Sequence, residues 1–113
     1  MISLIFPVYN EEPNLSVLYD RITKVAGQIV EDAFEFIFVD DCSSDKTPHI
    51  LKRLHEKDKR VKSIRFARNC GSHAAIVAGL NYCTGDAAII LAALIEGATL
   101  FGLVIMLLFK LLG

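Results

Sequence analysis

Aromatic, carboxylate and guanidinium side chains gather in three short segments of this sequence, each placed directly after an apolar run. These segments are 7–12, 40–47 and 68–71. The side chains that could do chemistry in them are Tyr9, Glu11, Asp40, Asp41 and Arg68. An aromatic ring can stack on a nucleobase, a carboxylate can accept from a base or a ribose, and a guanidinium can pair with phosphates. Together they predict a nucleoside diphosphate site.

Each segment on its own has an ordinary structural explanation. Glu11 would complement a helix dipole, the aspartates would form a solvated turn, and Arg68 would be a surface charge. Their recurrence after successive apolar runs is what indicates a ligand. The first turn has no Gly-x-Gly-x-x-Gly, and no Gly-Lys-Ser/Thr loop follows a run, which disfavours dinucleotide and P-loop sites.

The apolar runs predict the strands that position these segments. Strands are expected to start near residues 2, 34, 61 and 86, the first ending at Pro7 and the last central in the sheet. Of the helices between them, the first is expected to end at Gly27 and the second to start at Pro48 with Thr47 as N-cap. The third is expected to cover 71–82. A repeat of about 30 residues is typical of βαβ units. The fold class is therefore α/β, an open parallel sheet, whose ligands bind beyond the carboxyl ends of the strands.

The length, charge and cysteine content of the chain limit the number of domains and the classes of ligand. The chain has 113 residues, room for one domain, and its 12 Lys and Arg balance 13 Asp and Glu, so charge does not indicate nucleic acid. The three cysteines form no Cys-x-x-Cys pair, which favours reduced thiols in a cytosol-facing protein over a zinc site.

The composition changes after the fourth strand. From 87 to 109 the one charged residue is Glu96, and a span of about 20 apolar residues crosses a bilayer. We therefore expect a nucleotide-binding domain at 1–93 and a membrane helix at 94–113, with Lys110 reaching an interface. The alternative is a strand at 86–92 followed by a buried or amphipathic helix at 96–112.

In order along the chain, these segments resemble the family 2 glycosyltransferases of GT-A fold. The matching stretches are Ser-Leu-Ile-Phe-Pro-Val-Tyr-Asn-Glu-Glu at 3–12, Val-Asp-Asp-x-Ser-x-Asp-x-Thr at 39–47 and Arg-Asn-x-Gly at 68–71. The similarity covers residues 1 to about 93 and is closest to the branch that transfers sugars to dolichyl or polyprenyl phosphate. It implies a UDP- or GDP-sugar donor, a lipid-phosphate acceptor and a soluble part on the cytoplasmic side of a membrane, and leaves a homo-oligomer open.

The resemblance also implies roles for single residues. Those expected to line the nucleotide are Pro7, Tyr9, Glu11, Asp40 and Asp41, the two aspartates at the base or ribose. Those expected near the diphosphate and sugar are Arg68, Asn69 and Gly71. The family uses Mg or Mn held by an Asp-x-Asp motif after the fourth strand, but no aspartate follows Asp86 here.

That departure leaves the metal ligands and the catalytic residue unassigned. We expect an incomplete or internally deleted family member, with the activity of these 113 residues alone in doubt. The alternative is a non-catalytic, membrane-anchored nucleotide-binding remnant, or a subunit completed by another chain.

Two other α/β classes fit less well. A response-regulator receiver needs an aspartate after its third strand, where Arg68 and Asn69 stand. A phosphatase of the Asp-x-Asp-x-Thr type needs an aspartate two residues after Asp41, where Ser43 stands.

Overall fold

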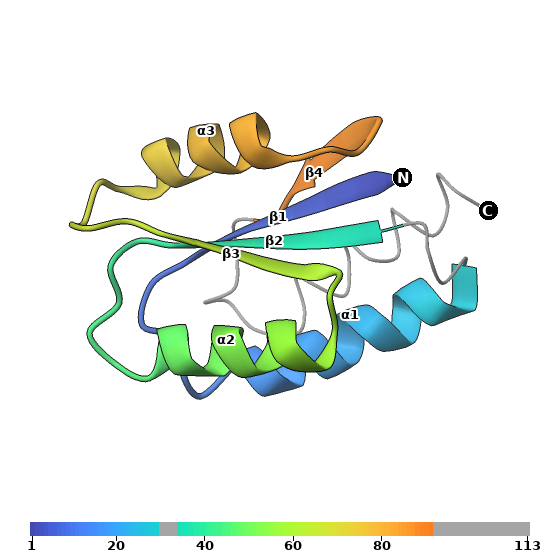
Figure 1. Cartoon of the computed structure of the whole chain (residues 1–113), viewed down its shortest axis with the longest axis horizontal. Coiled ribbons are helices and arrows are strands. Elements are labelled where there is room, and N and C mark those ends of the chain that lie inside the picture. The colour runs from blue at the N-terminus through green and yellow to red at the C-terminus, as the bar shows by residue number, and fades with distance from the viewer. Residues whose placement is uncertain (30–33, 92–113) are drawn as a thin grey trace.

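Strands and helices alternate along the chain (Figure 1). The computed structural model describes residues 1–29 and 34–91. The strands are β1 (Ile2–Val8), β2 (Phe34–Asp40), β3 (Val61–Arg65) and β4 (Ala87–Ile90), and the helices are α1 (Leu15–Ile29), α2 (Thr47–Lys57) and α3 (Ser72–Tyr82). The strands form a four-stranded sheet in the order β3-β2-β1-β4, and every pair is parallel. The predicted open parallel α/β sheet is thus confirmed.

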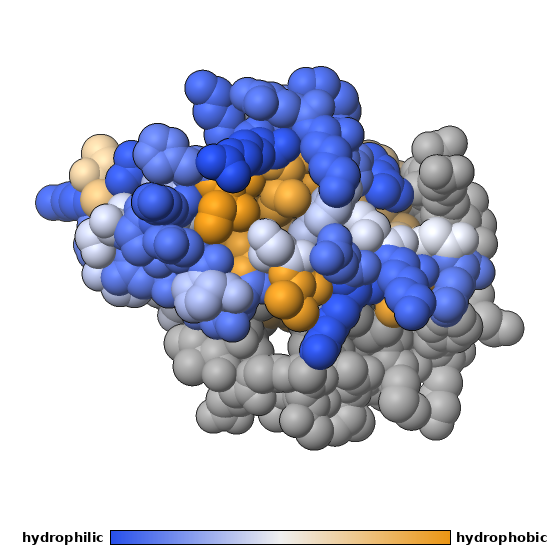
Figure 2. Space-filling model, turned by 90° about the horizontal axis from the view of Figure 1, so that it is seen from below, coloured by the Kyte–Doolittle hydropathy of each residue, from blue (hydrophilic) through white to orange (hydrophobic). Residues whose placement is uncertain are grey.

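The sheet has helices on both faces, with α1 and α2 on one and α3 on the other (Figure 1). On the α1–α2 face, alternate β1 and β2 residues form the larger core, in which the rings of Phe6 and Phe38 stack 4.7 Å apart. Each fully buried side chain of this size contributes roughly 1.5–3 kcal/mol. Hydrophilic residues cover most of this side of the described surface, around a hydrophobic strip (Figure 2).

The α3 face has a smaller core made by Ile5, Ile37, Val39 and Ala75. Here the helix lies very close to the sheet, because a Cβ added at Gly79 would come 2.5 Å from Cγ2 of Ile5. The small residues of α3 therefore allow the helix to lie close to the strands of the sheet.

Two helix ends differ from the prediction. Gly27 lies inside α1 and not at its end, because α1 continues to Ile29. The buried face of this helix includes Ile22 and Ala26. Thr47 is the first residue of α2 and not its cap. Its hydroxyl accepts the backbone N–H of Glu11 (3.0 Å), while Asp45 accepts the backbone N–H of Thr47 (2.9 Å).

The prediction that Pro7 ends the first strand is also wrong, since β1 runs on to Val8. Backbone groups of a strand alternate in direction, and the carbonyl of Ile5 points to β4, where it accepts from Leu91. The backbone nitrogen of Pro7 faces the same side as the groups of Ile5. The last residue pair of β1 and β4 is Ile5 with Ile90, so Pro7 lies beyond the paired part of β4. Its missing N–H therefore removes no ladder hydrogen bond.

The fourth strand was expected to be central, but within the described residues β4 lies at an edge of the sheet. Three of its four residues, Ala87, Ala88 and Ile90, are exposed. No helix in the part of the chain that the structure describes is long and apolar enough to span a bilayer. The predicted membrane helix at 94–113, its alternative at 96–112, and Glu96 lie outside that part.

A buried carboxylate joins the strands at the amino end of the sheet. Glu35 in β2 is 1% exposed and pairs with Lys62 of β3 (Nζ to Oε1, 2.7 Å). It also accepts from the Ser3 hydroxyl of β1 and from the backbone N–H groups of Thr84 and Gly85 before β4. Burial raises the pKa of Glu35, but the bonds from Lys62, Ser3 and Thr84 outweigh it and lower the pKa from 4.5 to about 2.

Candidate functional site

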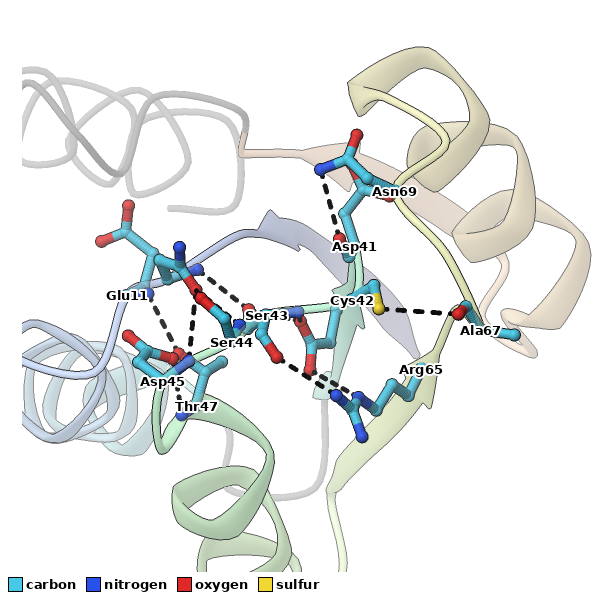
Figure 3. Close-up of polar contacts among 12 residues, drawn as sticks. Glu11, Asp41, Cys42, Ser43, Ser44, Asp45, Thr47, Arg65, Ala67 and Asn69 are labelled. Atoms are coloured by element: carbon cyan, nitrogen blue, oxygen red, sulfur yellow. Dashed lines mark hydrogen bonds and ion pairs between the residues drawn. The ribbon is translucent and has the colours of Figure 1, made fainter.

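The loops that follow β1, β2 and β3 meet at the carboxyl edge of the sheet (Figure 3). The first two are joined through Asn10, whose side-chain oxygen accepts the backbone N–H of Ser44 (2.8 Å). The backbone N–H of Asn10 in turn donates to the hydroxyl of Ser43 (2.9 Å). Asn10 has a φ of 51°, a left-handed conformation that asparagine tolerates better than most residues. It therefore links the two loops at a sharp turn.

Further along the same two loops, a carboxylate of each loop accepts a backbone N–H group of the other loop. Glu12 accepts the backbone N–H of Lys46 (2.9 Å), and Asp45 accepts that of Glu12 (3.2 Å). Burial raises the pKa of Asp45, but hydrogen bonds from Thr47 and Glu12 outweigh it and keep the pKa below the ordinary value. These reciprocal bonds fix the start of α2 relative to the chain that leads into α1.

Asp40 closes a turn at the end of β2. One of its oxygens, Oδ1, accepts both the backbone N–H (2.9 Å) and the hydroxyl (2.5 Å) of Ser43. Its other oxygen, Oδ2, is buried and lacks a hydrogen bond from the described residues, with Nε of Arg65 3.5 Å away. The side chain is 0% exposed. Asp40 thus shapes the turn from inside it.

Asp41 joins the second loop to the third. Its two carboxylate oxygens accept the backbone N–H groups of Cys70 (2.7 Å) and Gly71 (3.0 Å). Its backbone oxygen accepts from the side-chain amide of Asn69 (3.5 Å; Figure 3). Gly71 has a φ of 92°, which an L side chain rarely adopts, so glycine is needed where the loop turns into α3.

Tyr9, Arg68 and Asn69 are exposed at this edge, whereas the carboxylates beneath them are not. Tyr9 is 48% exposed, Asp41 7% and Glu11 5%. Glu11 accepts from the side-chain amide of Asn14 (2.9 Å). The edge therefore presents an aromatic ring and an arginine above a floor of buried acceptors, which suits a ligand with both a flat ring and negative charge.

The residues described provide no group of three or more His, Cys, Asp or Glu side chains that could hold a metal ion. The carboxylates of the edge already accept hydrogen bonds from loop donors, and each oxygen of Asp41 accepts one backbone N–H group. These side chains do not fit a resident Mg or Mn. The segment after β4, where the family motif would stand, lies outside the described residues.

Comparison with known proteins settles the family. The model of glycosyl transferase family 2 matches residues 3–93. The chain belongs to glycosyl transferase family 2. Its members transfer sugars from nucleotide-sugar donors, as the resemblance of the motifs implies.

Two curated relatives are similar to the matched part of this chain. The uncharacterized glycosyltransferase YkcC of Bacillus subtilis (strain 168) is 41% identical over 91 residues, 80% of this chain and 28% of that protein. The undecaprenyl-phosphate 4-deoxy-4-formamido-L-arabinose transferase of Yersinia pestis (strain Pestoides F) is 41% identical over 93 residues, 81% of this chain and 28% of that protein. This family 2 chain thus spans 28% of the length of these relatives.

Solved structures confirm the GT-A-type fold of the family 2 domain. S. aureus TarS 1-349 in complex with UDP superposes with a TM-score of 0.69 at 24% identity, covering 81% of this chain and 27% of that one. The mannosyltransferase PcManGT from Pyrobaculum calidifontis, in complex with GDP-Man and Mn2+, gives a TM-score of 0.68 at 25% identity, with 81% and 27% covered.

The structure brings the predicted site residues of this family 2 domain to one edge, although their contacts with a ligand stay predictions. Pro7 lies near the end of β1, and Tyr9 and Glu11 follow that strand. Asp41 holds the segment that carries Arg68, Asn69 and Gly71. Asp40 is 0% exposed and Asp41 7%, so the geometry favours Asp41 over Asp40 for direct contact.

The residues that hold the loops together were not predicted from the sequence. These are Asn10, Ser43, Asp45 and Arg65. Asn10, Ser43 and Asp45 stand inside the matched stretches 3–12 and 39–47, so their side chains could have been identified there as links between the loops. Arg65 had no signal, because its partner is known only once β2 and β3 are paired in register.

Proposed function

We propose that the described domain binds the nucleoside diphosphate of a UDP- or GDP-sugar at the carboxyl edge of its sheet. The observation that carries this is the interlocking of the three loops by hydrogen bonds between side chains and backbone, with Tyr9 and Arg68 exposed on top. Such bonds preorganise the loops, so a ligand loses little free energy in ordering them. Family membership supports the same ligand class.

In this proposal each exposed group has a separate task. Tyr9 stacks on the base, and Asp41 accepts from the base or ribose with the lone pairs its backbone partners leave free. Arg68 pairs with the diphosphate, and Asn69 contacts it or the sugar. The basic group would stabilise the charge on the departing diphosphate during transfer.

The acceptor in this proposal is a polyprenyl phosphate, and the complete protein acts at the cytoplasmic face of a membrane. An undecaprenyl-phosphate transferase among the 41% identical relatives supports this acceptor class. The apolar composition after Leu91 supports the membrane location, since Glu96 and Lys110 are its two charges.

Calorimetric titration of the 113-residue chain in mild detergent with UDP and GDP, with and without Mg or Mn, tests the donor site. We expect micromolar to millimolar binding, tighter for one base, that needs no metal. An absence of binding by a chain whose circular dichroism shows it folded would refute the donor site.

A transfer assay separates the two candidate functions. The same chain is given a labelled UDP- or GDP-sugar and a short polyprenyl phosphate in detergent. Label in the lipid fraction would show a transferase, whereas binding without transfer would favour the nucleotide-binding remnant or subunit. That second candidate is favoured by the sequence after the fourth strand, in which no aspartate follows Asp86.

A further inference from the structure

Arg65 is the last residue of β3, directly beside Asp40 in the parallel register of β2 and β3. Its guanidinium reaches across to the end of β2 with two nitrogens (Figure 3). Nε lies 3.5 Å from Oδ2 of Asp40, and Nη2 donates to the backbone oxygen of Ser43 at 3.1 Å. One side chain, 52% exposed, thus contacts the first and last residues of the 40–43 turn.

The turn needs such a partner because it contains buried negative charge. Asp40 is 0% exposed, and the two hydrogen bonds from Ser43 both go to Oδ1. A buried carboxylate is expensive unless it is paired. Among the described residues Arg65 is the one cation in ion-pair range of Asp40. Its planar fork suits two separate acceptors better than an ammonium would.

From this turn the contacts lead to the residues that the proposed function uses. Ser43 accepts the N–H of Asn10, which is the neighbour of Tyr9. Asp41 lies within the turn and holds Cys70 and Gly71. A shift of the turn would therefore displace both the ring and the segment that carries Arg68.

We propose that Arg65 is a positioning residue of the nucleotide site, which fixes the 40–43 turn and does not contact the nucleotide. This inference rests on the proposed function. The geometry favours it over a phosphate contact, because Arg65 shares the α1–α2 face with Asp40, whereas 68–71 leads to α3 on the other face. Both acceptors that its guanidinium contacts also belong to the 40–43 turn.

A series of ligands with and without phosphates distinguishes positioning from phosphate binding. Whichever of UDP and GDP binds more tightly is compared with its nucleoside monophosphate and its nucleoside, by calorimetry or by ligand-observed NMR. Because positioning acts on the whole site, Arg65→Ala should weaken all three by a similar factor, roughly tenfold. A loss confined to the diphosphate would show a direct phosphate contact and overturn the proposal.

A double-mutant cycle tests whether Arg65 acts through Asp40. In an Asp40→Asn background, Arg65→Ala should reduce affinity by a smaller factor than in the unaltered chain, because the ion pair is already gone and only the hydrogen bond to Ser43 remains to be lost. Arg65→Lys should give an intermediate affinity, since it keeps the charge but not the fork. The matched control is Arg53→Ala on the exposed side of α2, which should bind like the unaltered chain.

The outcomes also separate this inference from the function it rests on. Thermal unfolding of each variant shows whether lost affinity is merely lost fold, and affinities are compared well below the midpoint. If the unaltered chain binds neither UDP nor GDP, the proposed function and this inference both fail. If it binds and Arg65→Ala binds equally well, or if Arg65→Ala costs as much affinity in the Asp40→Asn background as in the unaltered chain, the inference alone fails.

Discussion

At the amino end of the sheet one buried carboxylate accepts many hydrogen bonds, whereas at the carboxyl end each of several buried carboxylates accepts only one or two. Glu35 accepts from Lys62, Ser3, Thr84 and Gly85. At the other end Asp40, Asp41 and Glu11 are all buried, and the one ion pair that these three carboxylates make with described residues is that of Asp40 with Arg65. The carboxylates at both ends join neighbouring segments, but only those at the carboxyl end have hydrogen-bond acceptor capacity that the described residues leave unused.

This difference separates stability from binding. A fully satisfied buried network holds strands together and offers nothing to a ligand. A network with spare acceptors and exposed Tyr9 and Arg68 has unmet hydrogen-bonding capacity that a ligand can meet. Substitutions at the amino end should therefore change the free energy of unfolding, and those at the carboxyl end should change mainly the affinity for nucleotide.

The largest expected effect on stability comes from Glu35→Ala. It leaves Lys62 without its partner and removes the acceptor of buried donors, so the free energy of unfolding should fall by about 3 kcal/mol. Urea unfolding followed by circular dichroism measures it. Glu56→Ala, on the exposed side of α2, is the control and should change stability by less than about 0.5 kcal/mol. A Glu35→Ala chain as stable as this control would remove the contrast between the two ends.

The pH dependence of stability gives the next largest effect. The pKa of Glu35 is lowered to about 2 in the fold, so its contribution is complete above pH 4.5 and declines as pH falls from 4.5 toward 2. The loss should reach about 2 kcal/mol by pH 3. Glu35→Gln lacks this titration, so the stability difference between it and the unaltered chain should shrink over the same range. A difference that stays constant from pH 7 to pH 3 would contradict the assignment.

At the carboxyl end, Asp41→Asn should have a smaller effect on stability and a larger one on binding. The new amide would direct an N–H at the backbone N–H of Cys70 or Gly71, which costs about 1–2 kcal/mol. Affinity for UDP or GDP should fall more than tenfold, because 68–71 is displaced. Asp20→Asn on the exposed side of α1 is the matched control. Unchanged affinity with reduced stability would make Asp41 a purely structural residue.

The fold could be predicted because its signals are local. Phe-rich and Ile-rich runs spaced by helical periodicity indicate the strands and helices, and the stretches at 3–12, 39–47 and 68–71 indicate the family. Helix ends were harder, since Thr47 uses its hydroxyl on Glu11 of another loop and not on its own helix.

The partners of buried charges could not be predicted, because register decides them. Glu35 stands in an apolar run, and its partners Ser3, Lys62 and Thr84 come from three distant segments. Arg65 reaches Asp40 only because β2 and β3 pair in parallel at that register. Such pairs follow from the sheet order, which composition and spacing leave open.

Tyr9→Ala should have the smallest effect on stability and so gives the sharpest separation of the two properties. The ring is 48% exposed, so its removal should change the free energy of unfolding by less than about 0.5 kcal/mol. If the ring stacks on the base, affinity for UDP or GDP should still fall roughly tenfold, as stacking contributes about 1–3 kcal/mol per base. Tyr9→Phe keeps the ring and should bind normally by calorimetry. Loss of affinity in Tyr9→Phe as well would mean that the hydroxyl, not the ring face, contacts the nucleotide, and equal affinity in all three chains would place the base away from β1.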